Sequence, residues 1–143
     1  MKDEELLAKE LEEGKELRLD FTKLEKAAAR SQGLVPVAVQ DFDTKEVILV
    51  AYTNREAFEK SVRTRTATFW STSRNELWVK GETSGNTFEL KEVYVNCEQN
   101  SLLYLVKPKR GGICHTYNEK GEARNCFYRR LDPETGKLEN TDP

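Results

Sequence analysis

Three cysteines are the residues of this chain whose type and spacing point most directly to chemistry. Cys97, Cys114 and Cys126 form an odd set, which does not suit a framework of disulfides within one chain. Thiolates favour zinc among the common intracellular metals. Three protein ligands that leave a fourth position for water are typical of a catalytic zinc, because the metal lowers the pKa of bound water. The cysteines therefore predict a hydrolytic zinc site, with separately buried, inert thiols as the alternative.

His115 is the only histidine in the chain and directly follows Cys114. One interpretation is a closed, structural zinc site of three cysteines and this histidine. In extended backbone, however, neighbouring side chains point to opposite faces, so the two residues are poorly placed to bind one ion. A histidine beside a metal site titrates near neutral pH and suits a general acid or base. We therefore favour a catalytic role for His115.

A second candidate site lies between residues 74 and 85, where basic side chains occur among glycines and hydroxyl-bearing residues. Local positive charge and backbone N–H groups are what a phosphate ester needs. The residues are Arg74, Lys80, Gly81, Thr83, Ser84 and Gly85. Turns of this composition also connect ordinary hairpins, and no Walker or dinucleotide-binding motif is present. From the residues alone, both a phosphate-binding loop and an ordinary hairpin connection remain possible interpretations.

The elements that position these residues are expected to be a helical start followed by short strands. Residues 1–31 combine leucines with many charged residues, which predicts one or two amphipathic helices without a chemical role. Two Val-rich runs, LVPVAVQDFD and EVILVAYT, predict a hairpin. We expect a helix over residues 54–62 with Asn54 as its N-cap. Further strands are expected at 67–71, 76–80, 87–95 and 101–106.

This order of elements predicts an α+β fold with a mostly antiparallel sheet. Residues 107–125 contain a proline and three glycines, so an irregular connection is expected there. The polar C-terminal residues predict a loose terminus or a final hairpin. We divide the chain into an N-terminal helical segment (1–32), a catalytic domain (33–131) and a polar tail (132–143).

Composition restricts the partners and the compartment. The 143 residues suit one domain, and 23 Lys and Arg against 25 Asp and Glu leave a formal net charge of −2. So small a net charge gives no global attraction to nucleic acid or anionic lipid. No apolar run reaches the length of a signal-peptide core or a membrane span. We therefore expect a soluble cytoplasmic protein with neither nucleic acid nor membrane as a partner.

Beyond these patterns, residues 33–128 resemble the phosphoribosyl-AMP cyclohydrolase family. The resemblance is carried, in order, by GLVPVAVQDFDTKEVILVAYTNREAF, ATFWSTSRNELWVKGETSGN, NCEQNSLLYLV, CHT and NCFYR. It implies a homodimeric hydrolase of histidine biosynthesis that breaks the N1–C6 bond of the adenine ring in phosphoribosyl-AMP. It also implies a shared zinc site, in which Cys97 of one subunit joins Cys114 and Cys126 of the other.

The resemblance also implies roles for other residues. His115, which matches the histidine beside the second zinc cysteine, would be catalytic. In the mechanism that we expect, a carboxylate such as Glu82 or Glu98 assists, and the sequence does not choose between them. The nucleotide site would comprise Ser71, Ser73, Arg74, Trp78, Lys80, Gly81, Thr83, Ser84 and Gly85.

Three departures from the family pattern affect these expectations. Where the family usually has magnesium-binding aspartates, this chain has Asn96, Glu98 and Asn100. On a strand the three would share a face, so we expect a weakened magnesium site. Thr72 replaces a usual arginine, and the 117–125 loop is longer than usual. Two alternatives follow: a diverged paralogue acting on another purine or pterin nucleotide, or a non-catalytic dimer stapled by zinc.

Overall fold

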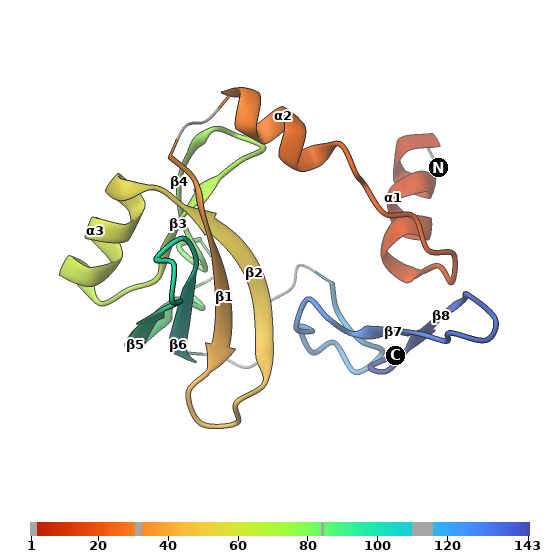
Figure 1. Ribbon diagram of the computed structural model, residues 1–143. Coiled ribbons are helices and arrows are strands. Elements are labelled where there is room, and N and C mark those ends of the chain that lie inside the picture. Colours follow the sequence, from red (N-terminus) through yellow and green to blue (C-terminus); the bar gives the residue numbers. More distant parts are fainter. Residues whose placement is uncertain (1–2, 31–32, 84, 110–115) are drawn as a thin grey trace. The chain divides into compact units, whose positions relative to one another are not determined.

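The computed structural model describes residues 3–30, 33–83, 85–109 and 116–143. The chain forms two compact units (Figure 1). One is Thr22–Gly111, and the other combines Met1–Phe21 with Gly112–Pro143. Helices α1 (Asp3–Glu13) and α2 (Lys23–Arg30) confirm the helical N-terminus, for which one or two helices were expected. None of the helices in the described ranges is long and apolar enough to cross a membrane.

The larger unit is built on a four-stranded sheet in the order β2-β1-β6-β5. The hairpin of β1 (Val35–Asp41) and β2 (Val47–Thr53) is antiparallel, as predicted. So is the pair of β5 (Phe88–Val95) and β6 (Leu102–Pro108). β1 and β6 run parallel and join the two hairpins into one mixed sheet. The α+β class is thus confirmed, and the strand pairs are mostly antiparallel, as expected. The parallel pairing of β1 with β6 was not predicted, because distant strand partners leave no local signal in the sequence.

Besides α2, this unit contains a second helix and a small hairpin. α3 (Arg55–Thr64) begins at the predicted cap, where the Asn54 side chain accepts a hydrogen bond from the Ala57 N–H at 2.9 Å. β3 (Thr68–Ser71) and β4 (Glu76–Val79) pair antiparallel. The Ala67 N–H donates to the Phe88 carbonyl at 2.9 Å, which attaches the start of this hairpin to β5. The β3–β4 hairpin is therefore anchored to the edge of the sheet.

Aromatic packing fixes the same hairpin from within the core. Phe69, Phe88 and Tyr104 are fully buried. The Phe69 ring lies 6.0 Å from Tyr104 and 5.8 Å from Trp78, measured between centroids. Each fully buried aromatic or aliphatic side chain of this size contributes about 1.5–3 kcal/mol, so the position of β3 and β4 against β6 is strongly determined.

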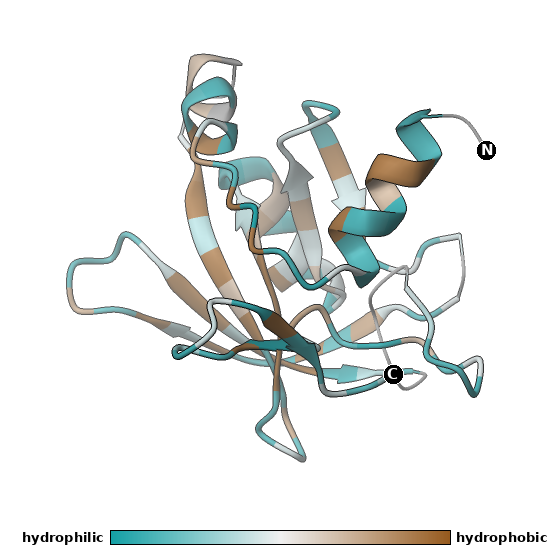
Figure 2. Cartoon of the chain, turned by 90° about the vertical axis from the view of Figure 1, so that its right-hand side faces the viewer, coloured by the Kyte–Doolittle hydropathy of each residue, from teal (hydrophilic) through white to brown (hydrophobic). Residues whose placement is uncertain are grey.

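The second unit joins the two ends of the chain. It contains α1 and a C-terminal hairpin of β7 (Arg129–Leu131) and β8 (Leu138–Asn140), one of the two outcomes expected for the tail. The last carbonyls of a helix lack partners within it, and here Tyr128 Oη donates to the Glu12 carbonyl at 2.7 Å. Arg129 Nη1 likewise donates to the Gly14 carbonyl at 2.9 Å. Figure 2 shows the alternating hydrophobic and hydrophilic bands of α1 near the N label.

Candidate functional site

The turn between β3 and β4 gathers three residues expected to bind the nucleotide. The Arg74 N–H and Nε both donate to Ser71 Oγ, at 3.3 and 3.4 Å. Ser71 Oγ and Ser73 Oγ lie 3.3 Å apart. Arg74 Nε is also 3.5 Å from a Glu76 carboxylate oxygen, but both side chains are more than half exposed. The turn therefore presents two hydroxyls and a guanidinium close together in solvent.

The loop that follows β4 contains the remaining predicted nucleotide-binding residues. Lys80 Nζ lies 5.2 Å from the centre of the Trp78 ring, within the range of a cation–π contact. Gly81 has a φ of 79°, and a Cβ at this position would lie 1.9 Å from the Asn86 carbonyl oxygen. The Gly85 N–H closes the loop by donating to the Gly81 carbonyl at 2.8 Å. Of the other predicted nucleotide-binding residues, Thr83 is exposed and Ser84 lies outside the described residues. Glu82, the predicted catalytic carboxylate, is exposed in the same loop.

Strand register places these two groups at opposite ends of one hairpin. Ser71 pairs with Glu76 at the turn, and Thr68 pairs with Val79 beside the loop. A strand rises roughly 3.3 Å per residue, so the two ends are on the order of 10 Å apart. The hairpin therefore offers two separate polar anchors along a single rigid element.

Cys97 lies in the turn that connects β5 to β6, with an exposed side chain. The sequence-based expectation that residues 96, 98 and 100 share the face of a strand is wrong, because β5 ends at Val95 and the left-handed residue Gln99, with a φ of 56°, turns the chain back. The turn nevertheless brings the three side chains together. Asn96 Nδ2 donates to Asn100 Oδ1 at 2.6 Å, and Asn100 Nδ2 donates to Glu98 Oε2 at 3.1 Å.

A cavity of about 1290 Å³ connects this turn with the β3–β4 hairpin. Its lining includes Leu77 of β4, Val95 of β5 and Gln99 of the turn, whereas none of the described residues predicted to bind nucleotide or metal lines it. Another part of the lining comes from α3, through Phe58 and five charged residues that the sequence patterns did not indicate. These are Arg55, Glu56, Glu59, Lys60 and Arg63. Their spacing in the sequence places them on one face of the helix, and this spacing is the pattern that could have predicted a charged face there.

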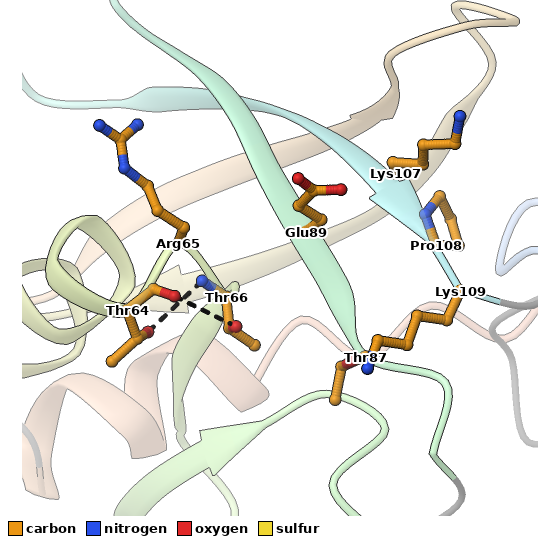
Figure 3. Close-up of a pocket in the computed structure, with 8 residues that line it drawn as sticks. All are labelled: Thr64, Arg65, Thr66, Thr87, Glu89, Lys107, Pro108 and Lys109. Atoms are coloured by element: carbon orange, nitrogen blue, oxygen red, sulfur yellow. Dashed lines mark hydrogen bonds between the residues drawn. The ribbon is translucent and has the colours of Figure 1, made fainter.

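A smaller cavity of about 480 Å³ lies apart from the predicted residues, at the ends of β5 and β6 (Figure 3). Arg65, Lys107 and Lys109 line it together with three threonines, Glu89 and Pro108. Glu89 pairs with Lys91 at 3.2 Å, and Lys107 pairs with Asp43 at 3.6 Å. Much of the charge at its rim is thus already balanced by neighbouring surface residues.

The remaining metal and acid–base candidates are divided between the units. Cys126 is exposed in the second unit, and Cys114 and His115 lie outside the described residues. Neither Cys97 nor Cys126 forms a disulfide with another described residue, as zinc-binding thiols require. Within the described ranges, no three His, Cys, Asp or Glu side chains are grouped to hold a metal. The three-cysteine site therefore stays a prediction.

An α+β unit that presents hydroxyl, guanidinium and ammonium groups on one hairpin, and whose sheet and helix α3 line a large cavity, has the organisation of an enzyme for a small polar substrate. Residues 49–128 match the family model described as phosphoribosyl-AMP cyclohydrolase. The chain is 53% identical over 102 residues to a phosphoribosyl-AMP cyclohydrolase of Nitrosopumilus maritimus, covering 71% of this chain and 89% of the relative. The chain belongs to the phosphoribosyl-AMP cyclohydrolase family, a family of hydrolases.

Two further relatives extend the comparison. A phosphoribosyl-AMP cyclohydrolase of Cenarchaeum symbiosum is 48% identical over 116 residues, which cover 81% of this chain and 98% of the relative. A histidine biosynthesis bifunctional protein of Thermus thermophilus is 53% identical over 100 residues, covering 70% of this chain and 44% of that longer protein.

Proposed function

We propose that this chain hydrolyses the N1–C6 bond of the adenine ring in phosphoribosyl-AMP, as a zinc-dependent homodimer in the cytoplasm. The observation that carries the proposal is the 53% identity to a phosphoribosyl-AMP cyclohydrolase over 89% of that relative's length. The place of such an enzyme would be in histidine biosynthesis, in agreement with the name of the bifunctional relative.

The β3–β4 hairpin supports binding of a substrate with two phosphates. Phosphoribosyl-AMP carries one phosphoribosyl group on N9 and a second on N1, so a phosphate lies at each end of an elongated molecule. Arg74 with the Ser71 hydroxyl at one end of the hairpin, and Lys80 at the other, are separated on the order of 10 Å along the strand. A guanidinium or ammonium group forms a charge-assisted hydrogen bond with a phosphate. We assign one phosphate to each anchor.

The chemical step would be supported by residues near the cysteines. Exposed thiols at Cys97 and Cys126 suit zinc, and Cys114 would complete the ligand set. Bound there, zinc would supply a Lewis acid that activates water toward C6. His115 would take the proton from the attacking water and return one to N1 as the ring opens. The substituted N1 is already cationic, so the ring is electrophilic before it binds. Glu82, exposed at the loop after β4, would assist as a carboxylate.

The proposal is tested by following ring opening by absorbance with phosphoribosyl-AMP and with AMP, which lacks the second phosphoribosyl group. We expect turnover of phosphoribosyl-AMP alone. Arg74→Ala and Lys80→Ala should each raise KM about tenfold or more, the loss expected for one charge-assisted hydrogen bond. Lys91→Ala, which removes an ammonium bound to Glu89 on the same unit, is the matched control. Turnover of other purine or pterin nucleotides alone would identify a diverged paralogue, and no turnover at all would favour a zinc-stapled dimer.

Complementation tests the shared zinc site. If Cys97 of one subunit joins Cys114 and Cys126 of its partner, Cys97→Ser and Cys126→Ser proteins are each inactive. In a hybrid dimer, one site then collects both changes and the other none. Random reassortment after mixed refolding leaves about a quarter of all sites intact. Recovery of about that fraction of wild-type activity supports the shared site, whereas no recovery would place all three ligands within one chain.

A further inference from the structure

The Asn96 side chain has an orientation that its backbone neighbours determine. The N–H groups of Asn100 and Ser101 both donate to Asn96 Oδ1, at 2.9 and 3.0 Å. A backbone N–H can only donate, so the atom facing these two groups must be the amide oxygen. The NH2 group of Asn96 therefore faces the opposite way, toward Asn100.

This orientation propagates through the turn. Asn96 Nδ2 can only donate, and at 2.6 Å from Asn100 it fixes the Asn100 oxygen as the acceptor. The Asn100 NH2 group then faces Glu98 Oε2 at 3.1 Å, and an ionised carboxylate can only accept. The three side chains are thus linked by two hydrogen bonds, one from the Asn96 NH2 group to Asn100 and one from the Asn100 NH2 group to Glu98. Backbone bonds from Gln99 N–H to the Asn96 carbonyl (3.0 Å) and from Asn96 N–H to the Ser101 carbonyl (3.2 Å) close the same turn.

The two NH2 groups occupy the positions at which carboxylates would present further oxygens. An amide nitrogen does not ligate magnesium, which requires oxygen donors and is bound through carboxylates. Asn96 Oδ1 already accepts two backbone bonds, and Asn100 Oδ1 accepts the Asn96 amide. Only the Glu98 carboxylate is charged, and it accepts from Asn100. The magnesium site implied by the family resemblance therefore does not fit this turn.

We propose that the amides of Asn96 and Asn100 replace a divalent cation as the cross-link of this turn, and so hold Cys97 in position without magnesium. Cys97 lies between Asn96 and Glu98 in the sequence, and both of these side chains bond Asn100, so the network determines the path of the backbone that carries the thiol. The inference rests on the proposed function only in taking Cys97 as a zinc ligand. Asn96 and Asn100 are positioning residues, because they act through the cysteine.

The test is the response of the full-length protein to magnesium. Melting temperature and zinc affinity, the latter from competition with a chromophoric chelator, are measured with and without about 10 mM MgCl2, an ample excess for a weak magnesium site. We expect neither quantity to change for the wild type. In Asn96→Asp a carboxylate oxygen replaces the NH2 group, so the hydrogen bond to the Asn100 oxygen is lost and two acceptor oxygens face each other. The melting temperature should then fall by about 4 °C and zinc affinity by about tenfold. Magnesium should restore most of both.

Asn54→Asp is the matched control, because it makes the same charge change in the same unit at a helix N-cap, where aspartate serves equally well. It should show no magnesium response. If Asn96→Asp does not fold, Asn100→Asp places a second carboxylate beside Glu98 and should show the same rescue. A wild type whose melting temperature or zinc affinity rises with magnesium would overturn the inference, as would an Asn96→Asp protein indifferent to magnesium. Neither measurement uses turnover, so an inactive protein with the expected responses would refute the proposed function alone.

Discussion

Gly81 occupies a backbone position that alanine cannot take without moving its neighbour. Its φ is 79°, and an added Cβ would lie 1.9 Å from the Asn86 carbonyl oxygen and 2.1 Å from the Asn86 carbonyl carbon. The left-handed conformation costs an alanine about 1–2 kcal/mol. Because the obstructing atoms belong to the backbone, the loop must also shift, at a further cost of about 1–3 kcal/mol by analogy with overpacked cores. Gly81→Ala should therefore lose about 2–5 kcal/mol of unfolding free energy.

Gly33→Ala separates the two contributions. Gly33 has a similar φ of 70° in the same unit, but a Cβ there would meet no atom within 4 Å. It should lose only the conformational part, about 1–2 kcal/mol. Urea denaturation of both variants measures the two losses of unfolding free energy. They can be compared directly if the m-values of the two variants are equal. Equal losses for the two glycines would refute the argument that close packing against Asn86 determines this loop.

Three other changes test further parts of the structure. Tyr104→Phe should leave the unfolding free energy unchanged or raise it by up to about 1 kcal/mol in thermal unfolding. Among the described residues the buried Tyr104 hydroxyl forms no hydrogen bond of normal geometry. Burial raises the pKa of its phenol, and the nearby Ser61 and Thr53 hydroxyls only partly offset this. A loss of stability above about 1 kcal/mol would show that one of these two hydroxyls does bond Tyr104. Arg124→Met should cost about 2 kcal/mol, because the nearly buried guanidinium binds Glu13 at 2.6 Å and the Asp142 carbonyl at 2.8 Å. The exposed pair of Arg130 and Glu139 provides the control, and Arg130→Met should change the unfolding free energy by less than about 0.5 kcal/mol. His115→Ala should retain zinc and lose roughly two to four powers of ten in kcat, and loss of zinc instead would support a site of three cysteines and this histidine.

Local signals in the sequence were sufficient for most elements of the larger unit. The predicted helix over 54–62 is observed as Arg55–Thr64, because Asn54 caps it as expected. The β1–β2 hairpin followed from Val and Ile runs around a turn, in which Asp41 Oδ1 accepts the N–H groups of Asp43 and Thr44. Each of these features depends on residues within a few positions of one another, which is why sequence patterns indicate them.

Features that depend on distant residues were not predictable in the same way. The parallel pairing of β1 with β6 joins residues such as Val37 and Leu102. The contact between Glu13 and Arg124 spans 111 positions and links α1 to the C-terminal region. Asn96 and Asn100 were expected on one face of a strand, whereas a left-handed Gln99 makes a turn there and brings the two side chains into contact. Motif spacing thus led to a prediction of which residues form the site, while the register of β3 and β4 determines how the hairpin residues among them are arranged.

Zinc titration of the metal-free protein, with ring opening of phosphoribosyl-AMP followed in the same cuvette, tests the proposed function most directly. Three thiolate ligands bind zinc tightly, so activity should rise linearly with added zinc and level off at about one zinc per chain. Added magnesium should leave both the slope and the end point unchanged. Full activity before any zinc is added, or no activity at any zinc concentration, would contradict zinc-dependent hydrolysis by this chain.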